Sequence, residues 1–302
     1  VQSYLKAEAN RKLDIVRGSL MRGRLLRRGA EQFVFLLVIH HLAVDSQSLL
    51  TIFEQIRDFA ENADCGKQAV RRFNDFVIWE QDFLRTTDGI RQIRFWRDQQ
   101  VHLLNNDDKR LSHVPQFESE QWITRFGQER VTRINSVVRK LGVTRFSFLS
   151  AALAVLKEMS AGRRQVRIAC PLDVRPGQEY RDVVGCFVNA APLLLNIDPA
   201  STVASLVLST HNAIGDAISH RFGLGASSAA LASESGNALP SAPPDISFTW
   251  ESASQAQREL LRLFVPHDDA IGVPFIGQTW TPLVIPGRPA KFDLALMAHD
   301  LP

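Results

Sequence analysis

An apolar run that ends in two histidines gives way abruptly to a helical pattern, and this switch constrains the fold most. Residues 33 to 41, FVFLLVIHH, have the composition of a strand buried on both faces. Beyond Asp45 the apolar residues recur at helical spacing, at Leu49, Ile52, Phe53, Ile56 and Phe59. Asp45 or Ser46 can cap the N-terminus of this helix. His40 and His41 are therefore expected where a buried strand turns into a helix.

The rest of the chain alternates strand and helix patterns, which predicts an α/β protein with mixed sheets. Residues 19 to 28 and the apolar run form a predicted hairpin. Two helices joined at LGVT are predicted within residues 128 to 162. The other predicted elements are helices over 71–85 and 88–104, a strand and loop over 165–177, and an extended apolar segment over 183–197.

Two polar or small-residue stretches interrupt these patterns. Residues 105 to 116 are polar and contain Pro115, which predicts a boundary between an N-terminal lobe, 1–115, and a C-terminal lobe, 116–302. Residues 223 to 244 are rich in Gly, Ala, Ser and Pro, so we expect a long loop or a poorly ordered segment there.

Composition and charge exclude several classes of protein. No apolar run approaches the length of a membrane span and the N-terminus lacks signal-peptide features, so we expect a cytoplasmic protein with no membrane partner. The net charge of +3 is too small to favour nucleic acid as a partner. Cys65, Cys170 and Cys186 form no CxxC pair and are odd in number, which argues against a disulfide framework and a zinc ribbon.

The residues alone leave the role of the histidine pair open. Neighbouring strand residues point to opposite faces, so His40 and His41 cannot easily converge on one ion, and no metal site is expected. An imidazole held at the end of a buried strand suits acid–base chemistry near neutral pH. Equally, both histidines can simply be packed or hydrogen-bonded, with Asp45 serving only as a helix cap.

Several stretches in order resemble motifs of the condensation domain of nonribosomal peptide synthetases. HHLAVDSQS is similar to the HHxxxDGxS signature at His40, His41, Asp45 and Ser48. Further similarities are FNDFVIWEQ at 73–81 to aromatic-x-DYAxWQ, LGVTRFSFLSAAL to the helix pair opening the second lobe, VGCFVNAAPLLL at 184–195 to GxFVNTxPLR, and AKFDLAL at 290–296 to the KFDL strand. HHxxxD alone is shared by several acyltransferase families, whereas the ordered set is much more specific.

The resemblance implies a fold and an extent. It implies two chloramphenicol acetyltransferase-like lobes in a V with a central tunnel, entered from opposite faces by two phosphopantetheine arms. Relative to that pattern the chain looks like the central part of a domain, with an incomplete N-terminal lobe and further elements expected after KFDL. A fragment of this kind is expected to expose unpaired strand edges and to be poorly soluble alone.

The resemblance also implies an activity and partners. The family forms an amide between an acyl or peptidyl thioester on an upstream peptidyl carrier protein and the aminoacyl amine on a downstream one. An adjacent adenylation domain is a further expected partner. The domain itself is expected to bind no cofactor, because its substrates are carried on the 4′-phosphopantetheine of the carriers.

Residue roles are carried over by position in the motifs. His41 is expected to face the tunnel as the catalytic residue, either as a base or as a group that positions the amine. Asp45 is expected to form a structural ion pair, with Arg175 in CPLDVRPG as the candidate partner. Ser46, Asn189 and Trp250 are candidates for lining the tunnel.

Three departures from the family pattern leave other functions open. Ser46 replaces a glycine, Gln47 an aromatic residue and Leu194 the arginine of PLR. The serine adds bulk near the imidazole and loses the conformational freedom of glycine. The alternatives are a stand-alone HHxxxD acyltransferase that uses coenzyme A or carrier thioesters, and a catalytically silent domain that docks carrier proteins.

Overall fold

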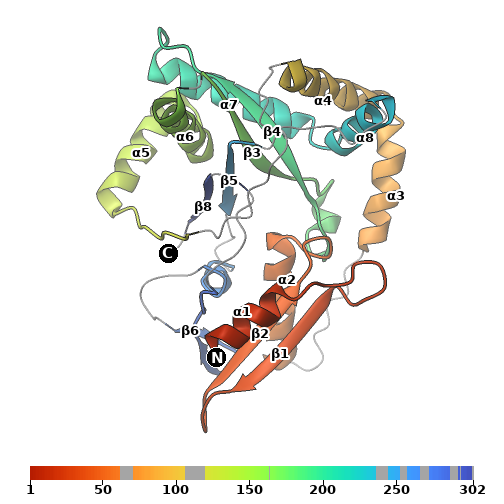
Figure 1. Ribbon diagram of the computed structural model, residues 1–302, viewed down its shortest axis with the longest axis vertical. Coiled ribbons are helices and arrows are strands. Elements are labelled where there is room, and N and C mark those ends of the chain that lie inside the picture. Colours follow the sequence, from red (N-terminus) through yellow and green to blue (C-terminus); the bar gives the residue numbers. More distant parts are fainter. Residues whose placement is uncertain are drawn as a thin grey trace.

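The computed structural model describes residues 1–61, 71–105, 120–162, 164–235, 244–251, 257–265, 272–285, 292 and 294–300. Helices and strands mix in both halves of the molecule, as the α/β prediction requires. Figure 1 shows a hairpin with helices beside it at one end and a four-stranded sheet with flanking helices at the other. In the described part of the chain, no helix is long and apolar enough to cross a membrane.

We use the term N-terminal lobe for residues 1–61, which contain the predicted hairpin and the helix that follows it. Its elements are α1 (Gln2–Asn10), β1 (Met21–Arg27), β2 (Phe33–Ile39) and α2 (Ser46–Glu61). The hairpin is antiparallel and its register pairs Met21 with Ile39 and Arg27 with Phe33. Both the hairpin and the helix after Asp45 are therefore confirmed.

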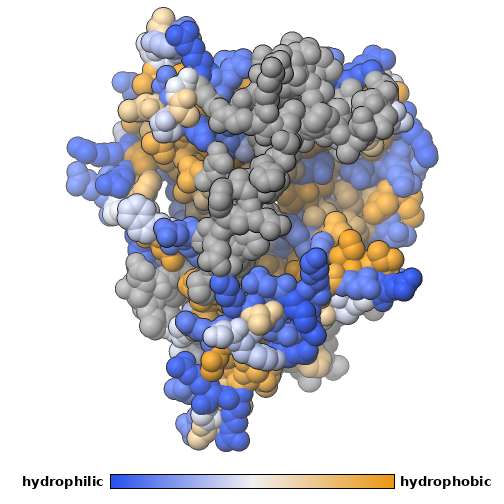
Figure 2. Space-filling view, viewed as in Figure 1, coloured by the Kyte–Doolittle hydropathy of each residue, from blue (hydrophilic) through white to orange (hydrophobic). Residues whose placement is uncertain are grey.

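The second strand of this hairpin is not buried on both faces, so that expectation is wrong. Val34 and Leu36 are buried under Leu5 of α1, whereas Phe33 and Phe35 are 56% and 43% exposed. Helix α1 covers one face of the two-stranded ribbon, and the other face is only partly covered. Figure 2 accordingly shows hydrophilic and hydrophobic residues side by side on the hairpin.

We use the term C-terminal lobe for the mixed sheet with the strand order β4-β3-β5-β8 and the helices that pack with it. Strand β3 (Gln165–Asp173) is antiparallel to β4 (Val188–Asn196) and parallel to β5 (Ile246–Glu251), which is parallel to β8 (Leu294–His299). Helices α6 (Arg145–Ala161) and α7 (Val203–Ser219) pack on this sheet, and α5 (Gln128–Leu141) lies beside α6 (Figure 1). Ala154 of α6 packs with Val166, Ile168, Leu195, Ile246 and Phe248 of the strands.

The predicted break between α5 and α6 follows from two residues of LGVT. Gly142 ends α5 in the left-handed conformation, with φ of 68°, which glycine adopts without steric cost. The Thr144 side chain accepts a hydrogen bond from the backbone N–H of Ser147 and so caps α6. The helix pair is confirmed, and its short link explains why the two helices are neighbours.

Helices α3 (Phe73–Leu84) and α4 (Thr87–Asn105) match the two predicted over 71–85 and 88–104, but α8 (Leu224–Ser235) corrects the expected loop. Leu224 packs with Trp96 of α4, and Ser227 is fully buried. Alanine and leucine favour helix, and small side chains allow close packing, so tertiary contacts order a stretch without sequence periodicity. Residues 236 to 243 of the expected loop lie outside the described residues.

Residues far along the chain pack against the N-terminal lobe. These elements are α9 (Arg258–Leu261), β6 (Val273–Phe275) and β7 (Gln278–Trp280). Leu260, Leu261 and Phe275 form one core with Leu50 and Phe53 of α2. The boundary predicted at residues 115 and 116 lies outside the described residues.

Candidate functional site

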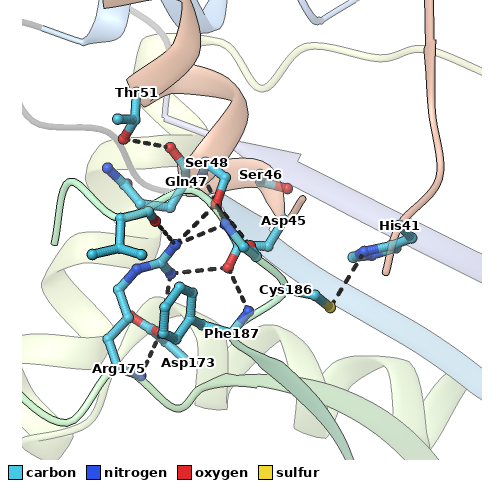
Figure 3. Close-up of polar contacts among 12 residues, drawn as sticks. His41, Asp45, Ser46, Gln47, Ser48, Thr51, Asp173, Arg175, Cys186 and Phe187 are labelled. Carbon is cyan, nitrogen blue, oxygen red and sulfur yellow. Dashed lines mark hydrogen bonds and ion pairs between the residues drawn. The ribbon is translucent and has the colours of Figure 1, made fainter. Parts of the chain in front are cut away.

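The histidine pair lies in a turn between β2 and α2. Strand β2 ends at Ile39, and His40 accepts hydrogen bonds from Leu42 N–H at its Nδ1 (3.1 Å) and from Ala43 N–H at its carbonyl (2.9 Å). The expectation that strand alternation separates the two imidazoles is therefore wrong. The turn separates them, because His40 folds back on the turn while His41 is exposed and points toward the C-terminal lobe (Figure 3).

Asp45 caps α2, as predicted, and also anchors it. Its Oδ1 accepts a hydrogen bond of 2.7 Å from the backbone N–H of Ser48. Arg175, in the loop after β3, lies 2.9 Å from Oδ2 through Nη1 and 3.0 Å from Oδ1 through Nη2 (Figure 3). The side chains of Asp45 and Arg175 are only 1% and 7% exposed. The expected ion pair is therefore present, bidentate and buried.

The surroundings of Arg175 hold its guanidinium in place. Nη1 also lies 3.2 Å from Asp173 Oδ1, and Nη2 donates to Ser48 Oγ at 3.1 Å. The guanidinium carbon lies 4.3 Å from the centre of the Phe187 ring, and the Phe187 N–H donates to Asp45 Oδ2 at 3.0 Å. The planar cation pairs through its two terminal nitrogens and packs one face on an aromatic ring, an arrangement that lysine could not reproduce.

The pKa of Asp45 reflects opposing influences. Burial by itself raises the pKa, but the hydrogen bond and charge of Arg175, together with hydrogen bonds from Ser48, lower it below the usual value. Asp45 is therefore ionised at neutral pH, and its pairing stabilises the contact between the lobes.

Acid should weaken this contact. A carboxyl with a depressed folded pKa contributes stability that is complete above its unfolded pKa, about 3.9, and is lost as pH falls through the folded value. In Asp45→Asn, we expect the free energy of unfolding to fall less than in the wild type as the pH is lowered. The urea midpoint of each protein, determined from about pH 6 to about pH 3, measures this difference. Curves for wild type and variant that stay parallel would remove Asp45 from the acid response.

Ser48 and Gly185 join the helix start to the C-terminal lobe by backbone contacts. Ser48 Oγ donates to Gly185 O at 2.8 Å and accepts from Gly185 N–H at 3.0 Å, and Asp45 N–H donates to the same carbonyl at 3.1 Å. All of these groups are buried. The segment around Gly185 is thus fixed relative to the histidine turn.

A side chain at position 185 should disrupt this contact. A Cβ built on Gly185 would overlap the ring of Phe73, which packs edge-on against Phe187. We expect Gly185→Ala to cost roughly 1–3 kcal/mol of unfolding free energy, measured by urea denaturation.

Gly215 provides the matched control for this substitution. It lies in α7, and a Cβ there meets nothing within 4 Å. Gly215→Ala should be neutral or stabilise by up to about 1 kcal/mol, because alanine favours helix. Equal effects of the two substitutions would contradict the close packing of Gly185 on Phe73.

Two contacts near His41 have no counterpart in the sequence prediction. His41 Nδ1 lies 3.8 Å from the sulfur of Cys186, the residue after Gly185. Ser46 Oγ donates to Glu251 Oε1 at 2.5 Å, and the other oxygen of Glu251 lies 3.6 Å from His299 Nδ1. Burial lowers the pKa of His299 by more than the charge of Glu251 raises it. These residues come together only through folding, although Cys186 does lie within the VGCFVN motif.

Asn189 and Trp250 lie in the C-terminal lobe. Asn189 donates through Nδ2 to the carbonyl of Arg221 at 3.2 Å, which ties β4 to the end of α7. The guanidinium of Arg145 lies 5.5 Å from the centre of the Trp250 ring. Their role in lining a tunnel stays a prediction. Among the described residues, no group of three or more histidine, cysteine or acidic side chains is placed to hold a metal ion.

A family model described as "Condensation domain" matches residues 1–240. Tyrocidine synthase 2 of Brevibacillus parabrevis is 25% identical over 296 residues, which cover 95% of this chain and 8% of that protein. Gramicidin S synthase 2 of Aneurinibacillus migulanus is 22% identical over 184 residues, 60% of this chain and 4% of that protein. The chain thus spans a small fraction of the curated relatives it matches.

Solved structures agree in fold. The first condensation domain of the CDA synthetase matches with a TM-score of 0.69 at 17% identity, over 99% of this chain and 62% of that one. A holo four-domain nonribosomal peptide synthetase bound to AMP and glycine matches with a TM-score of 0.76 at 16% identity, over 99% of this chain and 23% of that one. At these identities the likeness concerns the fold alone.

Proposed function

The chain belongs to the condensation-domain family of nonribosomal peptide synthetases, and from that premise we propose that it joins a thioester-bound acyl group to an amine. The donor in this proposal is an acyl or peptidyl group on an upstream carrier protein. The acceptor is the aminoacyl group on a downstream carrier, and the product is an amide. The observation that carries the proposal is the buried Asp45–Arg175 pair, which holds the His41 turn against the C-terminal lobe.

The reaction requires the protein mainly to position the thioester and the amine and to transfer a proton. A thioester is already activated, so the acceptor amine can attack it directly once the two are held at contact distance. The amine must be neutral to attack, and a proton must leave the nitrogen as the bond forms. The exposed imidazole of His41 can accept that proton or hold the amine by a hydrogen bond.

Rigidity of the turn favours this role for His41. A displacement of about 1 Å at a reacting group can cost about 10²-fold in rate. The backbone on both sides of His41 is fixed by His40, which closes the turn, and by Asp45, which is bound to Arg175, Ser48 and Phe187. His41 itself is left exposed between these anchors.

The partners in this proposal follow from the family. The substrates are carried on phosphopantetheine arms of an upstream and a downstream carrier protein, and an adenylation domain loads the acceptor. The domain itself holds no cofactor in this proposal. The relatives named as tyrocidine and gramicidin S synthases support a role in making a peptide product.

The experiment that tests this proposal compares donors and acceptors. Full-length protein is mixed with an acyl-loaded donor carrier and an aminoacyl-loaded acceptor carrier, and the mass of the acceptor carrier is followed. We expect an amide product on the acceptor carrier that depends on the carrier-bound donor. Equal rates with an acyl coenzyme A donor and a free amine would favour a stand-alone acyltransferase. Binding of the carriers without any product would favour a silent docking domain.

A further inference from the structure

Glu251 and His299 are the last residues of the parallel strands β5 and β8, and they are partners in the register of the sheet. Strand β3, which is parallel to β5, ends at Asp173 at the same end of the sheet, and the loop that follows carries Arg175. Ligand sites of sheets with parallel strands commonly lie outside the carboxyl ends of the strands. The end of the sheet that holds the His41 turn through Arg175 therefore also carries an acid and an imidazole that the proposed mechanism does not use.

Ser46 joins Glu251 to the helix that follows the His41 turn. It is the first residue of α2, directly after Asp45 (Figure 3), and its Oγ donates to Glu251 Oε1 at 2.5 Å. The condensation-domain motif has a glycine at this position, and glycine has no side chain to make the contact. The contact is therefore a feature of this chain, which points to selectivity and not to the reaction that the family shares.

The carboxylate of Glu251 is mostly buried and lacks a counter-charge in the described part of the chain. Its side chain is 15% exposed, its Oε1 is bound by a neutral hydroxyl, and its Oε2 accepts no hydrogen bond from the described residues. The guanidinium of Arg145, beside Trp250, is paired with Asp300 at 3.0 Å instead. Burial of a charge without a partner costs free energy, so a ligand cation at Oε2 would be stabilising.

His299 does not supply the missing charge. Its Nδ1 lies 3.6 Å from Glu251 Oε2, is buried, and makes no hydrogen bond with the described residues. Burial lowers the pKa of His299 by more than the charge of Glu251 raises it, so the imidazole is neutral at neutral pH. A carboxylate oxygen and an imidazole nitrogen are thus left without hydrogen-bond partners at one point. A cationic group with several N–H donors can meet both.

The reacting nitrogen of the acceptor is a poor partner for this carboxylate. A nearby negative charge stabilises the protonated form of an amine, whereas the acceptor amine must be neutral to attack the thioester. A second cationic group that takes no part in the reaction has no such conflict. An ammonium or guanidinium at the end of a substrate side chain is therefore the group that suits Glu251.

We propose that Glu251 is a specificity-determining residue, which binds the cationic side chain of one of the two substrates. The inference rests on the function proposed above, because that function supplies the substrates. The ligand class is an amino acid with an ammonium or guanidinium side chain, carried as the acyl donor or as the acceptor. Glu251 Oε2 accepts from the N–H groups of this side chain, and Ser46 holds the carboxylate in place through Oε1.

The first test measures equilibrium binding to the full-length protein. The probes are unreactive amide analogues of the pantetheine thioesters of arginine and of citrulline, whose side chain has nearly the same shape without the charge. A free α-amine represents the acceptor and an acetylated one the donor, so the form that discriminates identifies the substrate. In one of the two forms, we expect arginine to bind about 10- to 100-fold more tightly, the range of a hydrogen bond to a charged group. Equal affinities in both forms would overturn the inference.

Glu251→Gln removes the charge and keeps the shape and an acceptor for the Ser46 hydroxyl. It should abolish the preference for arginine, and its urea midpoint should not fall below that of the wild type, because an unpaired buried charge is removed. Glu129, an exposed acid in the first turn of α5, supplies the matched control, and Glu129→Gln should keep the preference. A preference that survives in Glu251→Gln would overturn the role of Glu251.

The second test compares condensation rates with arginyl and citrullinyl carriers in the same preparations. Amide formation without a preference for arginine in binding or in rate would overturn this inference and leave the proposed function standing. A binding preference that depends on Glu251, with no amide formed from any pair of carriers, would support the inference and count against the proposed function.

Discussion

Replacing His41 with alanine is expected to slow amide formation about 10²- to 10⁴-fold, the range typical of a general acid–base group. His41 is the exposed member of the histidine pair, and its turn is fixed on both sides. The alanine variant keeps these anchors and loses only the group that accepts or orients the acceptor proton. The measurement is the single-turnover rate of product formation on the acceptor carrier, with both carriers fully loaded.

A slower rate in His41→Ala can be assigned to the loss of the imidazole only if the variant is as stable as the wild type. The His41 side chain is exposed, so its removal should change the unfolding free energy by less than about 0.5 kcal/mol, as seen in a urea titration. His220, which follows the last residue of α7 and stacks on Phe95 with ring centres 4.0 Å apart, supplies the matched control, and His220→Ala should keep the wild-type rate. A His41→Ala variant that condenses as fast as wild type would remove His41 from the mechanism.

Loss of either partner of the Asp45–Arg175 pair should give the largest loss of stability. Breaking a buried pair from one side leaves an uncompensated charge, which costs about 3–5 kcal/mol. Asp45→Ala leaves the guanidinium, 7% exposed, with only the exposed carboxylate of Asp173 as a counter-charge, and also removes the cap of α2. Arg175→Ala strands the carboxylate. Urea denaturation of each variant measures the loss, and the condensation rate should fall with it because the His41 turn is released.

The double variant measures the interaction between Asp45 and Arg175 apart from the other contacts that each residue makes. Asp45→Ala with Arg175→Ala removes both charges, so we expect a loss smaller than the sum of the single losses by about 1–3 kcal/mol. Asp173, which is 60% exposed and also contacts Arg175, supplies a control on the same guanidinium. Asp173→Ala should cost less than about 1 kcal/mol, as is typical of exposed pairs. Additive single losses would mean that Asp45 and Arg175 act independently.

Local signals in the sequence predicted much of the fold around the site. The change of hydrophobic period after Asp45, the helix cap at Asp45 and the LGVT link are each predicted from a few neighbouring residues, and each is present in the structure. The pairing of Asp45 with Arg175 came from motif position, since residues 130 positions apart leave no local signal of contact.

The remaining features depend on tertiary structure. Helix α8 forms in an Ala- and Ser-rich stretch because it packs on α4. Its sequence has no hydrophobic periodicity from which a helix could be predicted. The exposure of Phe33 and Phe35 depends on which face of the hairpin α1 covers. The contacts of His41 with Cys186 and of Ser46 with Glu251 join residues 145 and 205 positions apart, so only the folded chain reveals them.

The most direct measurement is affinity labelling by a donor carrier whose acyl group is replaced by a chloroacetyl amide. Such a group alkylates the nucleophile nearest to the position of the acyl carbon, and peptide mapping of the full-length protein identifies that residue. We predict attachment at His41 or Cys186, with Cys186→Ser moving the label to His41. Attachment only at residues outside the turn at 40–45 and the segment at 183–187 would contradict the placement of the reaction at this contact between the lobes.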